Sequence, residues 1–205
     1  MRRSTLRFGF FNSVDFNDMV RLAHDLQSFL RISRSLTPYT SYVAFFDPAI
    51  VAFSLLSDYE NAFWRVLNAL NSLDNRTWPE SIDPRVDTPS WEFSFAGEMM
   101  FVVCNTPLHH SRLSRYSPGF TITFQPRWVF DKIGAGTVAG DSARAEIRRR
   151  LESYDSVAPF PRLGAYGEEA NREWEQYFLP DDNTVTNRNC PMVVTNRARQ
   201  RIVAA

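Results

Sequence analysis

The feature that most constrains the fold is a pair of short apolar segments joined through two residues, Ala96 and Gly97, that suit a tight turn, with Glu98 following them. WEFSF (91–95) and MMFVVC (99–104) flank Ala96 and Gly97. Two short strands joined this closely can only pair antiparallel. A third segment, FTITFQ (120–125), alternates apolar and polar residues and is followed by Pro126. The sequence therefore predicts a mostly antiparallel sheet.

Segments with helical periodicity lie before and after these strands in the sequence. Residues 17–33 place one apolar stripe at helical spacing, and SYVAFF (41–46) and IVAFSLL (50–56) are further apolar runs, the first typical of a strand. Ser57 with Glu60 three residues later forms a capping-box pattern that predicts the start of a second helix. Residues 75–90 are rich in Pro, Asp and Ser and predict a long loop.

A third helix is expected to begin at Asp141 and to end near Tyr154, with four residues facing inward: Ala143, Ile147, Leu151 and Tyr154. Helices beside antiparallel strands indicate the α+β class. We predict a single domain over residues 1–205, with a loosely packed tail from about residue 184.

Composition narrows the function. The chain has 205 residues, enough for one sizeable core, and its formal net charge is zero. A broad basic surface for nucleic acid or an anionic membrane is therefore not expected. No apolar run is long enough to span a bilayer, and the N-terminus lacks the apolar segment of a signal peptide. We expect a cytoplasmic protein whose aromatic content would permit a homodimer.

Several familiar sites are disfavoured. Cys104 and Cys190 belong to no CxxC pair, which argues against a thiolate zinc site and leaves a disulfide open. Three histidines and no HExxH motif leave too few ligands for a metal-dependent hydrolase. GAGTVAG (134–140) lacks the spacing of a nucleotide-binding loop, so we interpret it as a flexible turn before a helix.

The strongest site candidate is NTPLHHSRLSR (105–115), where Pro107 interrupts a strand. His109 and His110 would point in different directions from an extended backbone. A neutral imidazole is a good axial ligand for haem iron. Guanidinium groups match haem propionates or a substrate carboxylate, and the candidates are Arg112, Arg115 and Arg127. A ligand site, a catalytic base and a solvated corner all remain open, and the solvated corner is the more frequent case.

Five ordered segments resemble the YqcI/YcgG family: WPESIDP (78–84), PSWEFSFAGE (89–98), TPLHHSRLSR (106–115), FQPRWVFD (124–131) and LGAYG with EWEQYFLPDD (163–182). The resemblance runs from about residue 40 to residue 190. Family members with known roles include haem-dependent oxygenases that hydroxylate a guanidine nitrogen of arginine or of its derivatives in bacterial natural-product pathways. The resemblance therefore implies haem b, dioxygen and a small guanidine- or amine-bearing substrate. No electron donor is implied.

By position, the resemblance makes His109 the proximal iron ligand, with Arg112, Arg115 and Arg127 as the motif arginines. In the N-hydroxylase branch, the corresponding segment is similar to H-P-x-x-S-R-x-x-R-R. When this pattern is aligned on Arg112 and Arg115, its histidine falls at Pro107, two residues before His109. His110 is the alternative ligand.

Further roles follow if a cofactor and a cationic substrate bind here. Glu92 or Asp131 would hold a substrate guanidinium, and Phe124 and Trp128 would line the cofactor, with ordinary core packing as the alternative for these aromatic residues. Two other functions remain: a haem protein with a sensing or different oxidative role, and a haem-free binding protein.

Overall fold

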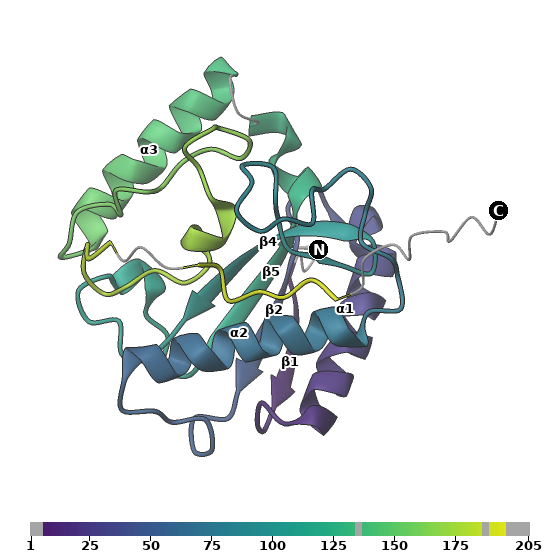
Figure 1. Ribbon diagram of the computed structural model, residues 1–205. Coiled ribbons are helices and arrows are strands. Elements are labelled where there is room, and N and C mark those ends of the chain that lie inside the picture. The colour runs from purple at the N-terminus through teal and green to yellow at the C-terminus, as the bar shows by residue number, and fades with distance from the viewer. Residues whose placement is uncertain (1–5, 134–136, 186–188, 196–205) are drawn as a thin grey trace.

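A five-stranded mixed sheet forms the centre of the protein. The computed structural model describes residues 6–133, 137–185 and 189–195. The strand order across the sheet is β1-β2-β5-β4-β3 (Figure 1). The strands are β1 (Leu6–Phe11), β2 (Ser41–Phe46), β3 (Ser94–Phe95), β4 (Glu98–Asn105) and β5 (Thr121–Pro126). Only β1 and β2 pair parallel, so the predicted α+β class and the mostly antiparallel sheet are confirmed.

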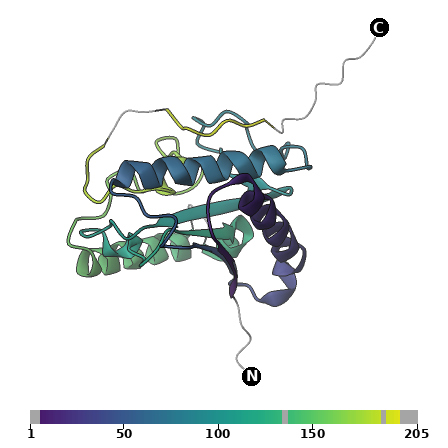
Figure 2. The same ribbon diagram turned by 90° about the horizontal axis from the view of Figure 1, so that it is seen from below.

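Three α-helices cover this sheet in the described part of the chain: α1 (Phe16–Leu36), α2 (Leu56–Leu73) and α3 (Val138–Tyr154). The apolar stripe of α1 is buried as expected, and its Phe29 contacts Tyr42 of β2. Tyr59 of α2 packs against Phe120, which lies just before β5. Viewed from below, α2 lies on one side of the sheet and α3 on the other (Figure 2). α1 also provides the crossover that a parallel β1–β2 pair requires.

The Ala96–Gly97 hairpin is confirmed, with positive φ angles of 54° and 80° at the two turn residues. A turn in which both central residues have positive φ matches the twist of its flanking strands. Of the predicted strand 91–95, only Ser94–Phe95 pairs with β4. All five residues of 91–95 are nevertheless buried, because the sheet edge here is covered on both sides.

The predicted start of α2 was wrong. α2 begins at Leu56, and its N-cap residue, Leu55, makes no side-chain capping hydrogen bond, so Ser57 forms no capping box. Residues 50–55 form no strand. The chain turns at Asp47 instead, whose carbonyl oxygen accepts from the amides of Ile50 and Val51.

α3 also differs from its prediction. Thr137 is the N-cap and accepts from the amide of Gly140, so the helix begins before Asp141. Ile147 and Tyr154 are exposed rather than inward. α3 packs mainly against two short 3-10 helices, η1 (Leu113–Arg115) and η2 (Arg127–Ile133), rather than directly on the strands. Residues 134–136 of the predicted turn lie outside the described residues.

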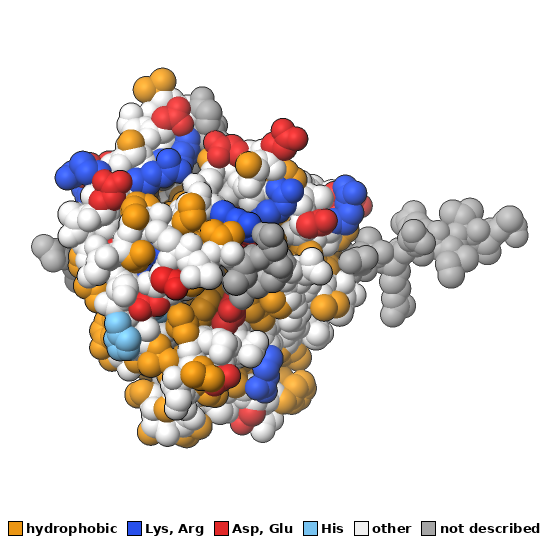
Figure 3. Space-filling view, turned by 60° about the vertical axis from the view of Figure 1, so that its left-hand side comes forward, with side chains coloured by type: hydrophobic (Ala, Val, Ile, Leu, Met, Phe, Trp, Pro, Cys, Tyr) orange, Lys and Arg blue, Asp and Glu red, His pale blue; other side chains and the backbone are white. Residues whose placement is uncertain are grey.

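Both arginine and acidic side chains lie on the surface over α3, as Figure 3 shows. No helix in the described residues is long and apolar enough to cross a membrane. Cys104 and Cys190 are not joined by a disulfide, so the pairing that the sequence left open does not form.

Candidate functional site

His109 lies in the loop after β4 and is fully buried. Its Nδ1 atom lies 2.9 Å from the hydroxyl oxygen of Thr106, and its Nε2 atom lies 2.9 Å from the carbonyl oxygen of Leu179. A carbonyl oxygen can only accept, so Nε2 carries the proton and Nδ1 accepts from Thr106. Burial lowers the pKa of His109, which keeps the ring neutral. Both ring nitrogens are therefore engaged within the protein.

Arg112 binds the same late segment of the chain and is 1% exposed. Its Nε donates to the carbonyl oxygen of Pro180, and its NH2 donates to the carbonyl oxygen of Asp182 and to Oδ1 of Asn183, each at 2.8 Å. In return, Asp181 accepts from the amides of Ser111 and Arg112. We call His109, Arg112 and Asp181 the loop clamp, because together they join the 106–112 loop to residues 179–183.

Arg115 is buried beside this clamp. Its NH2 donates to the carbonyl oxygen of Gln176 at 3.1 Å, and burial lowers its pKa to about 10. Arg112 and Arg115 thus bind carbonyl and amide groups of the chain itself. In this arrangement both ring nitrogens of His109 are engaged and offer no lone pair to an iron atom, and Arg112 is bound by oxygen atoms of residues 180–183. Arg115 NH1 is buried without a hydrogen-bond partner among the described residues. These residues, as placed, do not fit the haem attachment that the family resemblance implies.

Arg127 belongs to a second, separate cluster. Its Nε lies 2.9 and 2.8 Å from the two carboxylate oxygens of Glu92, and its NH2 contacts both Glu92 and Glu173. The Tyr166 ring lies 4.2 Å from the guanidinium carbon. Burial raises the pKa of Glu92 to about 7, although the hydrogen bonds from Arg127 act in the opposite direction. We call Glu92, Arg127 and Glu173 the buried charge cluster.

The remaining sequence candidates lie apart from both clusters. Phe124 is fully buried in the core and packs against Phe93. Trp128 is half-buried, with the guanidinium of Arg34 5.1 Å from its ring. Asp131 and His110 are exposed. The sequence candidates thus divide among the clamp, the charge cluster, the core and the surface.

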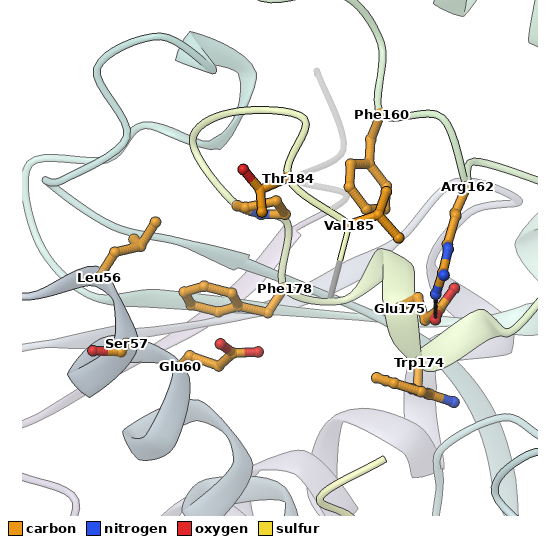
Figure 4. Close-up of a pocket in the computed structure, with 11 residues that line it drawn as sticks. Leu56, Ser57, Glu60, Phe160, Arg162, Trp174, Glu175, Phe178, Thr184 and Val185 are labelled. Carbon is orange, nitrogen blue, oxygen red and sulfur yellow. Dashed lines mark hydrogen bonds and ion pairs between the residues drawn. The ribbon is translucent and has the colours of Figure 1, made fainter. Parts of the chain in front are cut away.

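A pocket of about 190 Å³ opens between the first turns of α2 and residues 160–185 (Figure 4). This volume is below that of a drug-sized site and suits a small metabolite. The lining residues are Leu56, Ser57, Glu60, Phe160, Arg162, Trp174, Glu175, Phe178, Pro180, Thr184 and Val185. Trp174 and Glu175 belong to the third 3-10 helix, η3 (Glu173–Gln176).

No sequence pattern predicted this pocket. Its walls come from three segments more than 100 residues apart at the extremes, and the pattern at Ser57 and Glu60 does not indicate that this segment meets the other two. The quoted run EWEQYFLPDD (173–182) supplies four of the lining residues, and was the one available signal. The loop clamp fixes residues 179–183, which carry part of the wall. The clamp residues therefore position the pocket rather than face it.

The family pattern named YqcI/YcgG matches residues 1–193. The chain belongs to the YqcI/YcgG family. Two relatives from Bacillus subtilis (strain 168) are YcgG, 44% identical over 172 residues, and YqcI, 41% identical over 174 residues. The alignments cover 83% and 84% of this chain and 68% of each relative.

A third YqcI/YcgG relative carries a functional name. "Putative N(omega)-hydroxy-L-arginine synthase DcsA" of Streptomyces lavendulae is 31% identical over 196 residues, which cover 93% of this chain and 73% of the relative. No solved structure matches the chain significantly. The segments that carry the YqcI/YcgG resemblance meet in the structure, since 106–115 binds 176–183 and Arg127 binds Glu92 and Glu173.

Proposed function

We propose that this protein is an oxygenase that N-hydroxylates a small guanidine- or amine-bearing metabolite, arginine or a close analogue, in bacterial secondary metabolism. The supporting observation is the 31% identity, over nearly the whole chain, to a relative named as an N(omega)-hydroxy-L-arginine synthase. The pocket beside α2 is the proposed substrate site, because it combines an amino-acid-sized volume, aromatic walls and carboxyl groups.

The reaction inserts one oxygen atom of dioxygen into an N–H bond and reduces the other atom to water. It requires two electrons and two protons from an external reductant. We propose haem b as the cofactor, which would supply dioxygen activation when bound. Because His109, Arg112 and Arg115 do not fit its attachment, we assign no residue to the iron.

The chain's own contribution is binding and exclusion of water. Phe160, Trp174 and Phe178 surround the pocket and would shield a bound substrate from solvent. Shielding strengthens the interaction between a charged substrate and the carboxyl groups of Glu60 and Glu175, since the effective dielectric constant falls.

The decisive experiment supplies the purified protein with haem, a reductant, dioxygen and L-arginine. Mass spectrometry should detect a product heavier by one oxygen atom, and oxygen consumption should depend on arginine. An absorption spectrum of the same sample should show a Soret band. A Soret band without arginine-dependent oxygen consumption would instead support a haem protein with another oxidative or sensing role.

A haem-free binding protein is the second candidate, and one observation favours it. Both ring nitrogens of His109, the residue that the family resemblance makes the iron ligand, form hydrogen bonds within the fold. Absence of a Soret band under every loading condition, together with retained arginine binding, would select this second function.

A further inference from the structure

The two faces of the sheet differ sharply at the end that β1 and β2 form. Phe11 and Phe46, which are paired in register, point to one face and are buried in the core. Phe8, Phe10 and Phe45 point to the opposite face, where they are 61%, 67% and 36% exposed. We call these three residues the aromatic patch. The edge of the sheet therefore carries large apolar side chains on both faces, although only one face is packed.

The rings of the aromatic patch form one continuous surface. The Phe8 and Phe10 centroids lie 5.7 Å apart, and Phe45 lies 6.4 Å from Phe8 and 5.5 Å from Phe10. An aromatic side chain presents roughly 200 Å², so the exposed fractions correspond to about 300 Å² of apolar surface. Continuous apolar patches of a few hundred Å² are among the largest on soluble monomers and often mark an interaction site.

The paired neighbours of the aromatic patch on this face are uncharged. The strand register places five of them beside it: Val43, Val103, Asn105, Thr121 and Thr123. A sheet face that meets water normally carries polar side chains along each strand. α3 lies on this side of the sheet but packs mainly on η1 and η2, which leaves the patch open (Figure 2). The composition of this face is that of a surface covered by another apolar surface.

Charge and area indicate what the covering surface is. An uncharged patch gives no electrostatic attraction to nucleic acid, to an anionic membrane or to a charged peptide. It does match an identical patch, because a two-fold interface brings the same surface from both copies. Each copy has a formal net charge of zero, so two copies do not repel each other. A standard interface buries about 800 Å² per partner, and the patch has the size of its apolar centre, with threonine and asparagine side chains at the rim.

We propose that the aromatic patch binds a second copy of this chain, in a homodimer whose two-fold axis passes through the patch. The two sheets pack face to face, with rings of one copy inserted between side chains of the other, as in other stacked sheets. This inference concerns assembly and depends on neither the cofactor nor the substrate proposed above.

Analytical ultracentrifugation of the purified protein over a range of concentrations tests the inference. The wild-type protein should sediment with twice the 23.7 kDa mass of one chain. Phe10→Ser removes the most exposed ring and should raise the dissociation constant of the dimer roughly 10- to 100-fold. Phe10→Glu also places an unpaired charge at the centre of the interface, so its dissociation constant should rise by roughly 100-fold or more.

Two further variants serve as replicate and control. Phe8→Glu should dissociate the dimer as Phe10→Glu does, because both rings belong to the same patch. Leu55→Glu is the matched control, since Leu55 is 60% exposed at the start of α2, on the other side of the sheet. It should leave the mass unchanged. Circular dichroism checks the fold of each variant, and a charge at these exposed positions should be tolerated in the monomer.

Four results would overturn the inference. The first is a wild-type protein that stays monomeric at every concentration. The second is a dimer that survives both Phe10→Glu and Phe8→Glu, because another surface would then hold it. The third is a mass that rises beyond two copies, since a two-fold interface closes at two. The fourth is binding of a monomeric wild-type protein to phosphatidylcholine vesicles that Phe10→Glu abolishes, which would assign the patch to a membrane surface.

Discussion

The buried charge cluster makes the stability of this protein depend on pH in a direction opposite to that of most carboxyl groups. Glu92 is fully buried, and its pKa of about 7 lies well above the value of about 4.3 expected in an unfolded chain. The folded state therefore binds this proton more tightly. The stabilising contribution is complete below pH 4.3 and is lost as pH rises through 7.

The magnitude follows from the difference between the two pKa values. A separation of about 2.7 units corresponds to roughly 3–4 kcal/mol at most, since each unit contributes about 1.36 kcal/mol. Glu92→Gln cannot titrate and should remove this decline in stability between pH 4.5 and 7. The free energy of unfolding would be measured by urea titration at several pH values, with tryptophan fluorescence as the signal.

The variant Arg127→Met provides a second test of the pH dependence that Glu92 causes. Without its guanidinium partner, a charged Glu92 would be left buried, which typically costs about 3–5 kcal/mol. The cost should be greatest near pH 8.5 and smaller near pH 5.5, because Glu92 can take up a proton there. Arg149→Met removes an exposed arginine paired with Glu146 and should change little at either pH. An equal cost of Arg127→Met at both pH values would refute this reasoning.

Three further predictions concern single side chains. His109→Ala should lower the free energy of unfolding by about 2–3 kcal/mol, because it leaves buried polar partners unsatisfied, whereas the exposed His110→Ala should not. Neither change should alter a Soret band; loss of the band in His109→Ala alone, with stability unchanged, would show that His109 binds iron. Tyr177→Phe removes a hydroxyl group that accepts one backbone hydrogen bond and donates another, and should cost about 1–3 kcal/mol in urea unfolding; an unchanged midpoint would contradict the hydrogen bonds. Gly9→Ala would place a Cβ atom 2.3 Å from the hydroxyl oxygen of Tyr42, so its Tm should fall, and an unchanged Tm would mean that the tyrosine moves aside freely.

The alternation of apolar and polar residues predicted the central strands of the sheet but not the edge strand β1. β4 and β5 alternate between buried and more exposed positions, and this period is visible in the sequence. β1 was not predicted, since its outward positions carry Phe8 and Phe10, which are 61% and 67% exposed. When apolar side chains also lie on the solvent-exposed face, the sequence lacks the alternation of apolar and polar residues that identifies a strand. Ile147 of α3 was predicted to face inward because it is apolar, but it is exposed in the structure.

The candidate site shows a different limit. The motif around His109 was found, but its role depends on Leu179, which lies 70 residues later and contributes only a backbone carbonyl. Backbone acceptors carry no sequence signal. Glu92 was expected to hold a substrate guanidinium and Arg127 to bind a propionate or a substrate carboxylate, whereas the structure pairs them with each other. Pairing the two required knowledge of which strands are neighbours.

The late position of residues 171–183 has a consequence for how the chain acquires its structure during synthesis. Arg112, Arg115 and Arg127 receive acceptors from this stretch, and Tyr177 binds the backbone of 93–100. A nascent chain that ends before residue 171 holds these cations without the groups that neutralise or satisfy them in the finished protein. The native contacts of the loop clamp, and the contact of Arg127 with Glu173, can therefore form only after this late stretch has been synthesised.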